Sequence, residues 1–425
     1  MNPISNAQDQ IITVGLDIGS STIICAIGQI SMSTKQVKLL GISSVSSSGI
    51  RRGTITNRDE LIEKLELVLS EAEQMANVKV TKAILSITGD HIRSLNTQAA
   101  IALNRTNGSL SGIDERSITE NDVYQVLDLA QAVALPAERD ILHTLPQDYL
   151  LDTLEEIKNP VGMTGRRLEA RVHLITAATT AMNNIVSCVD ELGIVVEGLV
   201  FQPVASALAT LQEDEMELGI TVLEIGAFTT NIAVYHGGAI RHSAVLPIGA
   251  TSITNDIAVM LQIGTDDAEK IKIKYTSAKS SMSSPKLEID LPAQPGQLER
   301  SVSEQEVSRY VEARMQEIFQ MTIREISRAD IKDPLTYGLV LTGGGSHLKN
   351  IVPLAEETLG VKVRLGNPIK IDGIEGIADD PQNTTVMGLL LWPLYANDHT
   401  RLKKPVSRGF SEIIEKIRHT IEDIF

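Results

Sequence analysis

The chain has 425 residues, a formal net charge of −16 and 43 % hydrophobic residues. This length predicts about two to four folding units, with cores of aliphatic side chains because aromatic residues make up only 3 % of the chain. The acidic balance excludes a nucleic-acid-binding function, since phosphate backbones require a basic surface, and it predicts long-range repulsion from anionic lipids.

The cysteines and the apolar stretches predict a cytosolic protein. Cys25 and Cys188 both lie among aliphatic residues, which favours two buried reduced thiols over a disulfide or a zinc site. Residues 1–10 are polar and lack the apolar core of a signal peptide, and the apolar stretch 386–395 is too short to span a bilayer. We therefore expect a chain that reaches a membrane only by peripheral attachment.

In the first part of the chain, apolar residues flank short polar turns in a pattern typical of strands. The expected elements are a strand–turn–strand hairpin at 11–30, a strand at 37–45, a helix at 58–75 and a strand at 81–86. Residues 96–165 differ in character, because they are rich in polar and turn residues, most of all at 104–111.

We interpret residues 96–165 as a separate small module, inserted between two strands of the main body, with one helix at 120–134. A buried-looking strand at 170–177 is then expected to resume the main body. The following segment alternates between helices and strands, which predicts sheets covered by helices. Its expected elements are helices at 181–192 and 204–212 and strands at 195–200, 221–225 and 231–235.

The last two of these strands enclose a turn at Gly226 and so repeat the opening hairpin, which indicates a duplicated α/β unit. Toward the end we expect a loop rich in Ser and Pro at 277–301, a long helix at 303–327 and a strand at 337–342. Residues 397–407 are interpreted as a linker and residues 408–425 as a final helix.

The first hairpin carries residues suited to phosphate binding. Asp17 ends its first strand, where a carboxylate can hold a metal ion through water, and Gly19 lets backbone N–H groups approach phosphate oxygens. The hydroxyl groups of Ser20, Ser21 and Thr22 add further donors. A plain β-turn that merely uses Gly and Ser explains the same residues equally well.

The second hairpin repeats this arrangement with Glu224, Gly226 and Thr229. Two such hairpins facing each other would hold a triphosphate from both sides, and their paired occurrence is harder to explain by chance than either one alone.

A third Gly-rich segment, Gly343-Gly344-Gly345, follows the strand expected at 337–342. Three glycines permit close approach of the backbone to a flat or anionic ligand. Ser346 is expected to cap a helix that starts near Leu348. The alternative interpretation is an ordinary strand-to-helix turn.

The final helix has one narrow apolar face opposite its charged residues. This face consists of Phe410, Ile413, Ile414, Ile417, Ile421, Ile424 and Phe425. The preceding linker and the Phe at each end favour binding to a membrane or a partner over docking on the protein's own core, although the polar face is not strongly basic.

The three Gly-rich turns, in this order, resemble the superfamily of actin, Hsp70 and sugar kinases. Further blocks resemble FtsA, the family of actin-like bacterial division proteins that link tubulin-like FtsZ to the membrane. These blocks are Asn159-Pro160-Val161-Gly162-Met163 and residues 170–176, 232–235 and 237–240. The resemblance extends from about Val14 to Phe425, nearly the whole chain.

The resemblance to FtsA implies an α/β, actin-like fold with two lobes, each based on a ribonuclease-H-like unit, and an FtsA-type inserted subdomain. The implied parts are a first lobe at 1–88 and 169–203, an inserted subdomain for filament contacts at 89–168, a second lobe at 204–252 and 337–395, an outer subdomain that contacts FtsZ at 253–336, a linker at 396–407 and a membrane-targeting helix at 408–425.

The resemblance also implies ligands. ATP or ADP with Mg²⁺ would bind between the two phosphate turns, with Asp17 and Glu224 near the metal through water. Glu269 and Lys272 would flank the adenine and the ribose, a pair that would otherwise be interpreted as an ion pair on a helix surface.

The implied partners include the acidic C-terminal peptide of FtsZ, which Arg314 would bind. A solvated helix residue is the equally plain interpretation of Arg314. The other implied partners are further copies of the chain, other division proteins and lipid, with the protein attached to the cytoplasmic side of the cell membrane at the division site.

The second hairpin departs from the usual family pattern, Asp-x-Gly-x-Gly-Thr-x-Asp. Glu224 and Asn231 stand in place of its acids and Phe228 in place of its second glycine. We therefore expect nucleotide binding to be retained and hydrolysis to be slow or absent. Two alternatives stay open: a small-molecule kinase of the same superfold, for which the sequence offers no convincing base, and the actin-like pilus protein PilM, against which the insert and the final helix argue.

Overall fold

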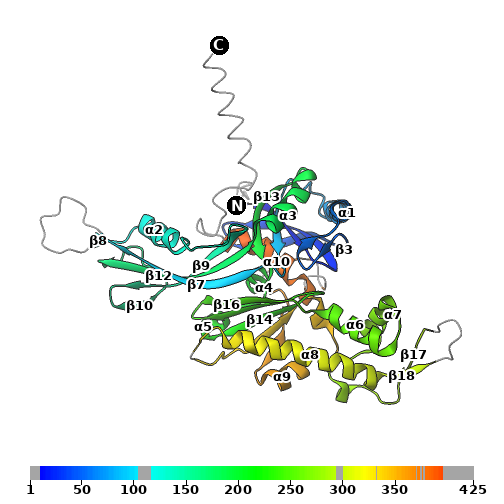
Figure 1. Cartoon of the computed structure of the whole chain (residues 1–425). Helices are drawn as coiled ribbons and strands as arrows, with labels where there is room; N and C mark the ends of the chain where they lie inside the picture. Colours follow the sequence, from blue (N-terminus) through cyan, green and yellow to red (C-terminus); the bar gives the residue numbers. More distant parts are fainter. Residues whose placement is uncertain are drawn as a thin grey trace, which may run out of the picture.

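The computed structural model describes residues 10–103, 116–292, 300–331, 333–369, 371–373, 376 and 379–395. Two sheets with their helices form two lobes, and a third sheet extends to one side of them (Figure 1). The loop expected at 104–111, the linker and the final helix with its apolar face lie outside the described residues. Within the described part, no helix is long and apolar enough to span a bilayer.

The first lobe is built on a six-stranded sheet in the order β13-β6-β1-β2-β3-β21. Its strands are β1 (Gln10–Ile18), β2 (Thr22–Ser31), β3 (Gln36–Ser46), β6 (Lys82–Ile87), β13 (Val195–Phe201) and β21 (Ile371–Asp372). Alternate side chains of a strand point to opposite faces. On β2, Ile23 and Cys25 pack in the core shared with helix α1 (Arg58–Ala76), whereas Ile24 and Ala26 pack with helix α10 (Thr384–Tyr395). Helices therefore cover both faces of this sheet.

The second lobe repeats this plan. Its five-stranded sheet has the order β16-β15-β14-β19-β20, formed by β14 (Ile220–Ile225), β15 (Thr230–His236), β16 (Ala239–Leu246), β19 (Leu339–Thr342) and β20 (Val363–Leu365). The β14–β15 hairpin is antiparallel and β19 lies parallel to β14, just as β6 lies parallel to β1 beside the β1–β2 hairpin. The duplicated unit expected from the sequence is thus present.

Six helices accompany the second sheet, namely α4 (Gln202–Thr210), α5 (Glu213–Leu218), α6 (Ala250–Leu261), α7 (Thr265–Tyr275), α8 (Glu304–Ser327) and α9 (Ile351–Leu359). Helix α8 runs along the outside of this lobe (Figure 1), and its buried face includes Val311, Met315 and Phe319. The remaining short elements are β4 (Ile50–Arg51), β5 (Thr54–Ile55), β8 (Arg116–Ser117), β11 (Thr164–Gly165), β17 (Glu288–Asp290), β18 (Ser301–Ser303), η1 (Ser280–Met282), η2 (Gly344–His347) and η3 (Pro381–Asn383).

The third sheet forms the inserted module. Its order is β10-β9-β12-β7, with β7 (Arg93–Ala102), β9 (Arg139–Leu151), β10 (Leu154–Ile157) and β12 (Arg167–Ala178), and helix α2 (Glu120–Ala130) packs on it. The strand expected at 170–177 differs from our interpretation, because it does not resume the main body. It lies within β12, which pairs with β7 and β9 inside the module. Helix α3 (Thr179–Glu191) follows β12 and belongs to the first lobe.

Burial alone misled the sequence interpretation of β12. Its residues are almost all buried, as in a strand of the main body. Leu168, Ala170 and Val172 are buried in the core of the module with α2, whereas Ile175 and Ala177 pack in the core of the first lobe. His173 hydrogen-bonds Ser243 of the second lobe. The helix expected at 120–134 ends earlier, at Ala130.

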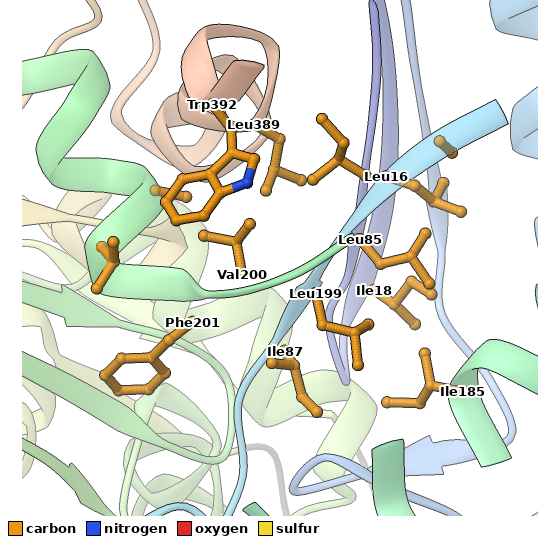
Figure 2. Packing of buried hydrophobic residues seen from close by; sticks show 14 of the residues in the cluster. Leu16, Ile18, Leu85, Ile87, Ile185, Leu199, Val200, Phe201, Leu389 and Trp392 are labelled. Atoms are coloured by element: carbon orange, nitrogen blue, oxygen red, sulfur yellow. The ribbon is translucent and has the colours of Figure 1, made fainter. Parts of the chain in front are cut away.

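The two lobes are joined where α4 and α10 cross. A Cβ atom at Gly388 of α10 would lie 1.8 Å from the carbonyl oxygen of Ala205 in α4, so the helices touch through backbone at this point. Figure 2 shows Leu389 and Trp392 of α10 among buried side chains of β1, β6 and β13. The longest apolar stretch near the end of the chain is therefore a core helix.

Candidate functional site

The turns of the two opening hairpins have the same geometry. In the first, the N–H of Gly19 donates to the carbonyl oxygen of Thr22 over 3.1 Å, and in the second the N–H of Gly226 donates to that of Thr229 over 2.9 Å. A Cβ at Gly19 would lie 2.6 Å from the Thr22 oxygen, and one at Gly226 would lie 3.1 Å from the Thr229 oxygen. The first turn therefore requires Gly19, whereas a side chain at Gly226 would fit only with a small shift of the turn.

The hydroxyl groups of the first turn remain available to a ligand. The side chains of Ser20, Ser21 and Thr22 form no hydrogen bond with any described residue, and Ser21 is exposed. Thr229 of the second turn likewise forms no side-chain hydrogen bond within the described part of the chain. These donors fit an anionic ligand at the turns.

Asp17, at the end of β1, is buried but keeps one oxygen free. Its Oδ1 accepts hydrogen bonds from Ser86 Oγ at 2.5 Å and Gln202 Nε2 at 2.8 Å. Its Oδ2 accepts none from the described residues and is not among their fully buried unpaired atoms, so it keeps some contact with solvent. Burial raises the pKa of Asp17 above the usual range of a carboxyl, although both hydrogen bonds oppose this.

Glu224, at the corresponding end of β14, is turned toward the protein. Its Oε1 accepts from Thr385 Oγ1 at 2.6 Å, and its Oε2 accepts from Asn231 Nδ2 at 3.4 Å. Burial, with a smaller contribution from the negative charge of Asp17, raises the pKa of Glu224 to about 7. Of the two acids, Asp17 alone has an oxygen that accepts no hydrogen bond from the described residues.

A buried polar network connects the two acids and thereby the two lobes. Asn231 Nδ2 donates to Gln202 Oε1 at 2.9 Å, and Gln202 in turn donates to Asp17. The Thr88 hydroxyl donates to Asn231 Oδ1 at 2.6 Å. Sequence reasoning missed Gln202 and Thr385, and the available signal was weak: each is a polar residue that begins or follows an apolar segment.

The glycine loop is partly a packing device. Gly343 has φ +78°, and a Cβ at Gly345 would lie 2.3 Å from Ile225 Cγ2. Gly344, in contrast, is exposed, and its Cβ would meet nothing closer than Gln382 Oε1 at 3.7 Å. Two of the three glycines are thus explained by contacts with the second hairpin, and only Gly344 leaves its face of the loop open.

The expected capping role of Ser346 is wrong. Ser346 lies within the short η2 helix, where its Oγ donates to the carbonyl oxygen of Gly343 at 2.7 Å. Helix α9 begins later, at Ile351, and follows Asn350 in a left-handed conformation. The helix therefore starts three residues later than the expected start near Leu348, after the separate η2 turn.

Glu269 and Lys272 lie on α7 and form more than a solvated ion pair. Lys272 is buried, and its Nζ donates to Glu269 Oε2 at 2.7 Å, to Thr254 Oγ1 at 2.9 Å and to the carbonyl oxygen of Ala250 at 3.4 Å. The N–H of Ala250 donates to the Gly226 carbonyl oxygen at 2.9 Å. Lys272 therefore supports the start of α6, which in turn holds the second turn.

Arg314 on α8 is already paired within the chain. Its Nε and Nη2 lie 2.6 and 2.8 Å from the two carboxylate oxygens of Asp256, and Nη1 also bonds Glu317. These bonds, that to Asp256 first, raise the pKa of the Arg314 guanidinium. A peptide carboxylate that bound Arg314 would have to share it with Asp256.

The arrangement fits a nucleotide better than it fits a bare metal ion. No cluster of three or more metal-ligating side chains occurs among the described residues. Mg²⁺ is commonly held by one or two carboxylates together with phosphates and waters. The free oxygen of Asp17, beside turns with unpaired hydroxyls, suits that mode of binding.

Sequence relatives decide the family. A family model described as "Cell division protein FtsA" matches residues 221–388, and one described as "SHS2 domain inserted in FTSA" matches residues 89–176. Cell division protein FtsA of Pseudomonas aeruginosa is 38 % identical over 391 residues, which cover 92 % of this chain and 91 % of that protein. The chain belongs to the FtsA family. FtsA of Escherichia coli is 31 % identical over 428 residues, or 99 % of both chains.

Solved structures confirm the actin-like fold expected from the sequence. The type IV pilus complex PilM–PilN has a TM-score of 0.62 at 19 % identity, covering 89 % of this chain and 97 % of that chain. MreB5 of Spiroplasma citri has a TM-score of 0.53 at 13 % identity, covering 90 % and 96 %. At these identities the likeness to PilM is one of fold, whereas the FtsA relatives define the family.

The SHS2 match also agrees with the sheet pairing of the inserted module. It extends from residue 89 to residue 176 and so includes most of β12, the strand that the sequence interpretation had assigned to the main body. In this FtsA chain the insert is thus a complete four-stranded unit.

Two neighbouring glycines allow the packing role of the loop to be separated from a ligand role. We expect Gly345→Ala to destabilise the fold by about 1–3 kcal/mol, because its methyl group would overlap Ile225. Gly344→Ala is expected to change stability by less than about 0.5 kcal/mol. Urea unfolding of both variants measures this difference, and equal losses would contradict it. Nucleotide affinity of Gly344→Ala then reports on ligand approach alone.

Proposed function

We propose that this FtsA chain binds ATP or ADP with Mg²⁺ between its two hairpin turns, assembles into filaments and links FtsZ to the cytoplasmic side of the cell membrane at the division site. The observation that carries the proposal is the convergence of two matched turns on one buried network, Asp17–Gln202–Asn231–Glu224, in a member of the FtsA family. Other division proteins would bind the same assembly.

Nucleotide binding is supported by the free donors of the first turn and the free oxygen of Asp17. Two structural neighbours, MreB5 chains of Spiroplasma citri, are described as bound to ADP and to AMPPNP. The nucleotide would supply the phosphates that complete a Mg²⁺ shell, with Asp17 as the protein carboxylate. Because Glu224 bonds Thr385 and Asn231 instead of facing a ligand, we propose that hydrolysis is slow or absent.

The nucleotide has a structural role in this proposal. It would touch the turns of both lobes and so favour one arrangement of the lobes. That arrangement would set the surfaces through which neighbouring copies contact each other in a filament. The inserted subdomain would supply the filament contact and the outer part of the second lobe would bind the FtsZ C-terminal peptide, with Arg314 shared between Asp256 and that peptide.

Membrane attachment is proposed from the sequence of residues 408–425 alone. Its apolar face, from Phe410 to Phe425, would bury in the lipid interface, where each fully buried side chain gives about 1.5–3 kcal/mol at most. Partial insertion and the cost of folding the helix make one copy a weak anchor. A filament that carries many copies would bind firmly through effective concentration.

Co-sedimentation with liposomes tests this proposal. We expect the full chain with Mg·ATP to carry FtsZ into the lipid pellet, whereas a chain that ends at Val406 leaves FtsZ in the supernatant, because the apolar helix is gone. FtsZ that lacks its C-terminal peptide is the control for the protein contact. If FtsZ pellets with the shortened chain, or does not pellet with the full chain, the proposed tethering of FtsZ to the membrane is wrong.

A further inference from the structure

A short segment of the first lobe connects the two candidate phosphate turns. The N–H of Ser47 donates to the carbonyl oxygen of Ser21 in the first turn at 2.9 Å. Four residues later, the guanidinium carbon of Arg51 lies 5.0 Å from the ring centre of Phe228 in the second turn. Arg51 thus places a positive charge on the turn in which Phe228 replaces a glycine of the family pattern.

Close backbone contacts fix the β4–β5 hairpin that carries Arg51. The carbonyl oxygen of Gly49 accepts from the N–H groups of Thr56 and Asn57, at 2.8 and 3.1 Å. At the tip, a Cβ at Gly53 would lie 1.9 Å from the carbonyl oxygen of Thr88, so the tip rests on the end of β6. Ile50 is buried in the first core. The base of the Arg51 side chain is therefore held in place.

The charge of Arg51 has no acidic partner among the residues that the structure describes. Within the described residues Arg51 forms no ion pair, whereas its neighbour Arg52 lies 3.7 Å from the carboxylate of Asp90. The aromatic face of Phe228 is a weak partner for a cation. A phosphate oxygen binds guanidinium more strongly, through charge-assisted and often paired hydrogen bonds.

We propose that Arg51 is a phosphate-binding residue of this site, held over Phe228 until the phosphates of a nucleotide arrive between the turns. This inference rests on the proposed nucleotide binding and adds to it the residue that recognises the polyphosphate. In the ligand-free chain the guanidinium then lies over the ring of Phe228.

Calorimetric titration of the full chain with Mg·ATP and with adenosine tests the inference. We expect Arg51→Ala to weaken ATP binding by about 10- to 100-fold, the usual effect of losing a hydrogen-bonded charge, and to leave adenosine binding within about twofold. Arg51→Lys keeps the positive charge and should lose less ATP affinity than Arg51→Ala. The matched control is Arg52→Ala, which removes an equal charge one residue away and should bind ATP as the unmodified chain does. Unfolding curves of the variants check that each is folded.

A second variant tests the role of Phe228. Phe228→Leu keeps an apolar side chain but removes the aromatic contact that stabilises Arg51 in the ligand-free chain, so we expect ATP affinity to rise by about two- to fivefold. The double variant with Arg51→Ala should bind ATP as Arg51→Ala alone does. Equal ATP affinity of Arg51→Ala and the unmodified chain would overturn this inference while nucleotide binding stands. An unmodified chain that binds neither ATP nor ADP would overturn both.

Discussion

Replacing Gly388 with alanine is expected to destabilise the whole fold by about 3 kcal/mol or more, at the upper end of overpacking effects. The added Cβ would lie 1.8 Å from the carbonyl oxygen of Ala205 and 2.3 Å from its carbonyl carbon. Both are backbone atoms, so no side-chain rotation relieves the overlap and α4 and α10 must separate. The same change would strain the Ser206–Thr385 and Thr385–Glu224 hydrogen bonds next to the crossing.

Gly198→Ala is the matched control, because its methyl group would meet only Trp392 Nε1 of the same helix α10, at 3.9 Å. Urea unfolding should give a much lower midpoint for Gly388→Ala than for Gly198→Ala, and adding Ala205→Gly should not restore it, since the obstructing atoms belong to the backbone. If Gly388→Ala unfolds at the same urea concentration as the control, the helices do not cross as closely as described.

The hairpins could be predicted from the sequence because their signals are local. Apolar runs on both sides of Gly19 and of Gly226 define strand, turn and strand within a few residues, and the repeat of that pattern reveals the duplication. Asp17 and Glu224 could be found in the same way, as the acids that end matching strands. What each acid does was not predictable, because that depends on partners that are far away in the sequence.

The hydrogen-bond network between Asp17 and Glu224 shows why these partners could not be predicted from the sequence. Gln202 is 185 residues from Asp17, and Thr385 is 161 residues from Glu224. Nothing local indicates that the two helices whose first turns carry these residues cross beneath both turns. The sequence interpretation of β12 was wrong for a related reason, because apolar residues predict that a strand is buried but not in which sheet.

Glu224→Gln is expected to make the protein more stable above pH 7. It should also reduce the change in the free energy of unfolding with pH. Burial raises the pKa of Glu224 from 4.5 to about 7, so the folded state holds this proton between those pH values while the unfolded state has released it. A group with a raised pKa contributes stability that is fully present below about pH 4.5 and is lost as the pH rises toward about 7. The loss amounts to about 3 kcal/mol, since one pKa unit corresponds to about 1.4 kcal/mol.

Glutamine is neutral at every pH, so it avoids the cost of a buried charge at high pH. Its Oε1 can accept from Asn231, while its amide donates to Thr385 Oγ1, which then donates to Ser206 Oγ, 2.9 Å away. The variant should therefore gain up to about 3 kcal/mol over the unmodified chain at pH 8 and little at pH 4.5.

Urea unfolding from pH 4.5 to 8.5 measures the difference, with the exposed Glu213→Gln as the control that should leave the profile unchanged. Asp17 keeps its own contribution in both proteins, because its pKa is raised as well, so some decline with rising pH should persist in Glu224→Gln. Parallel profiles for Glu224→Gln and the unmodified chain would mean that Glu224 is ionised at neutral pH despite its burial. The second acid of the site would then carry a full charge beneath the turns, and a bound polyphosphate would depend all the more on the positive charge of Arg51 and of Mg²⁺.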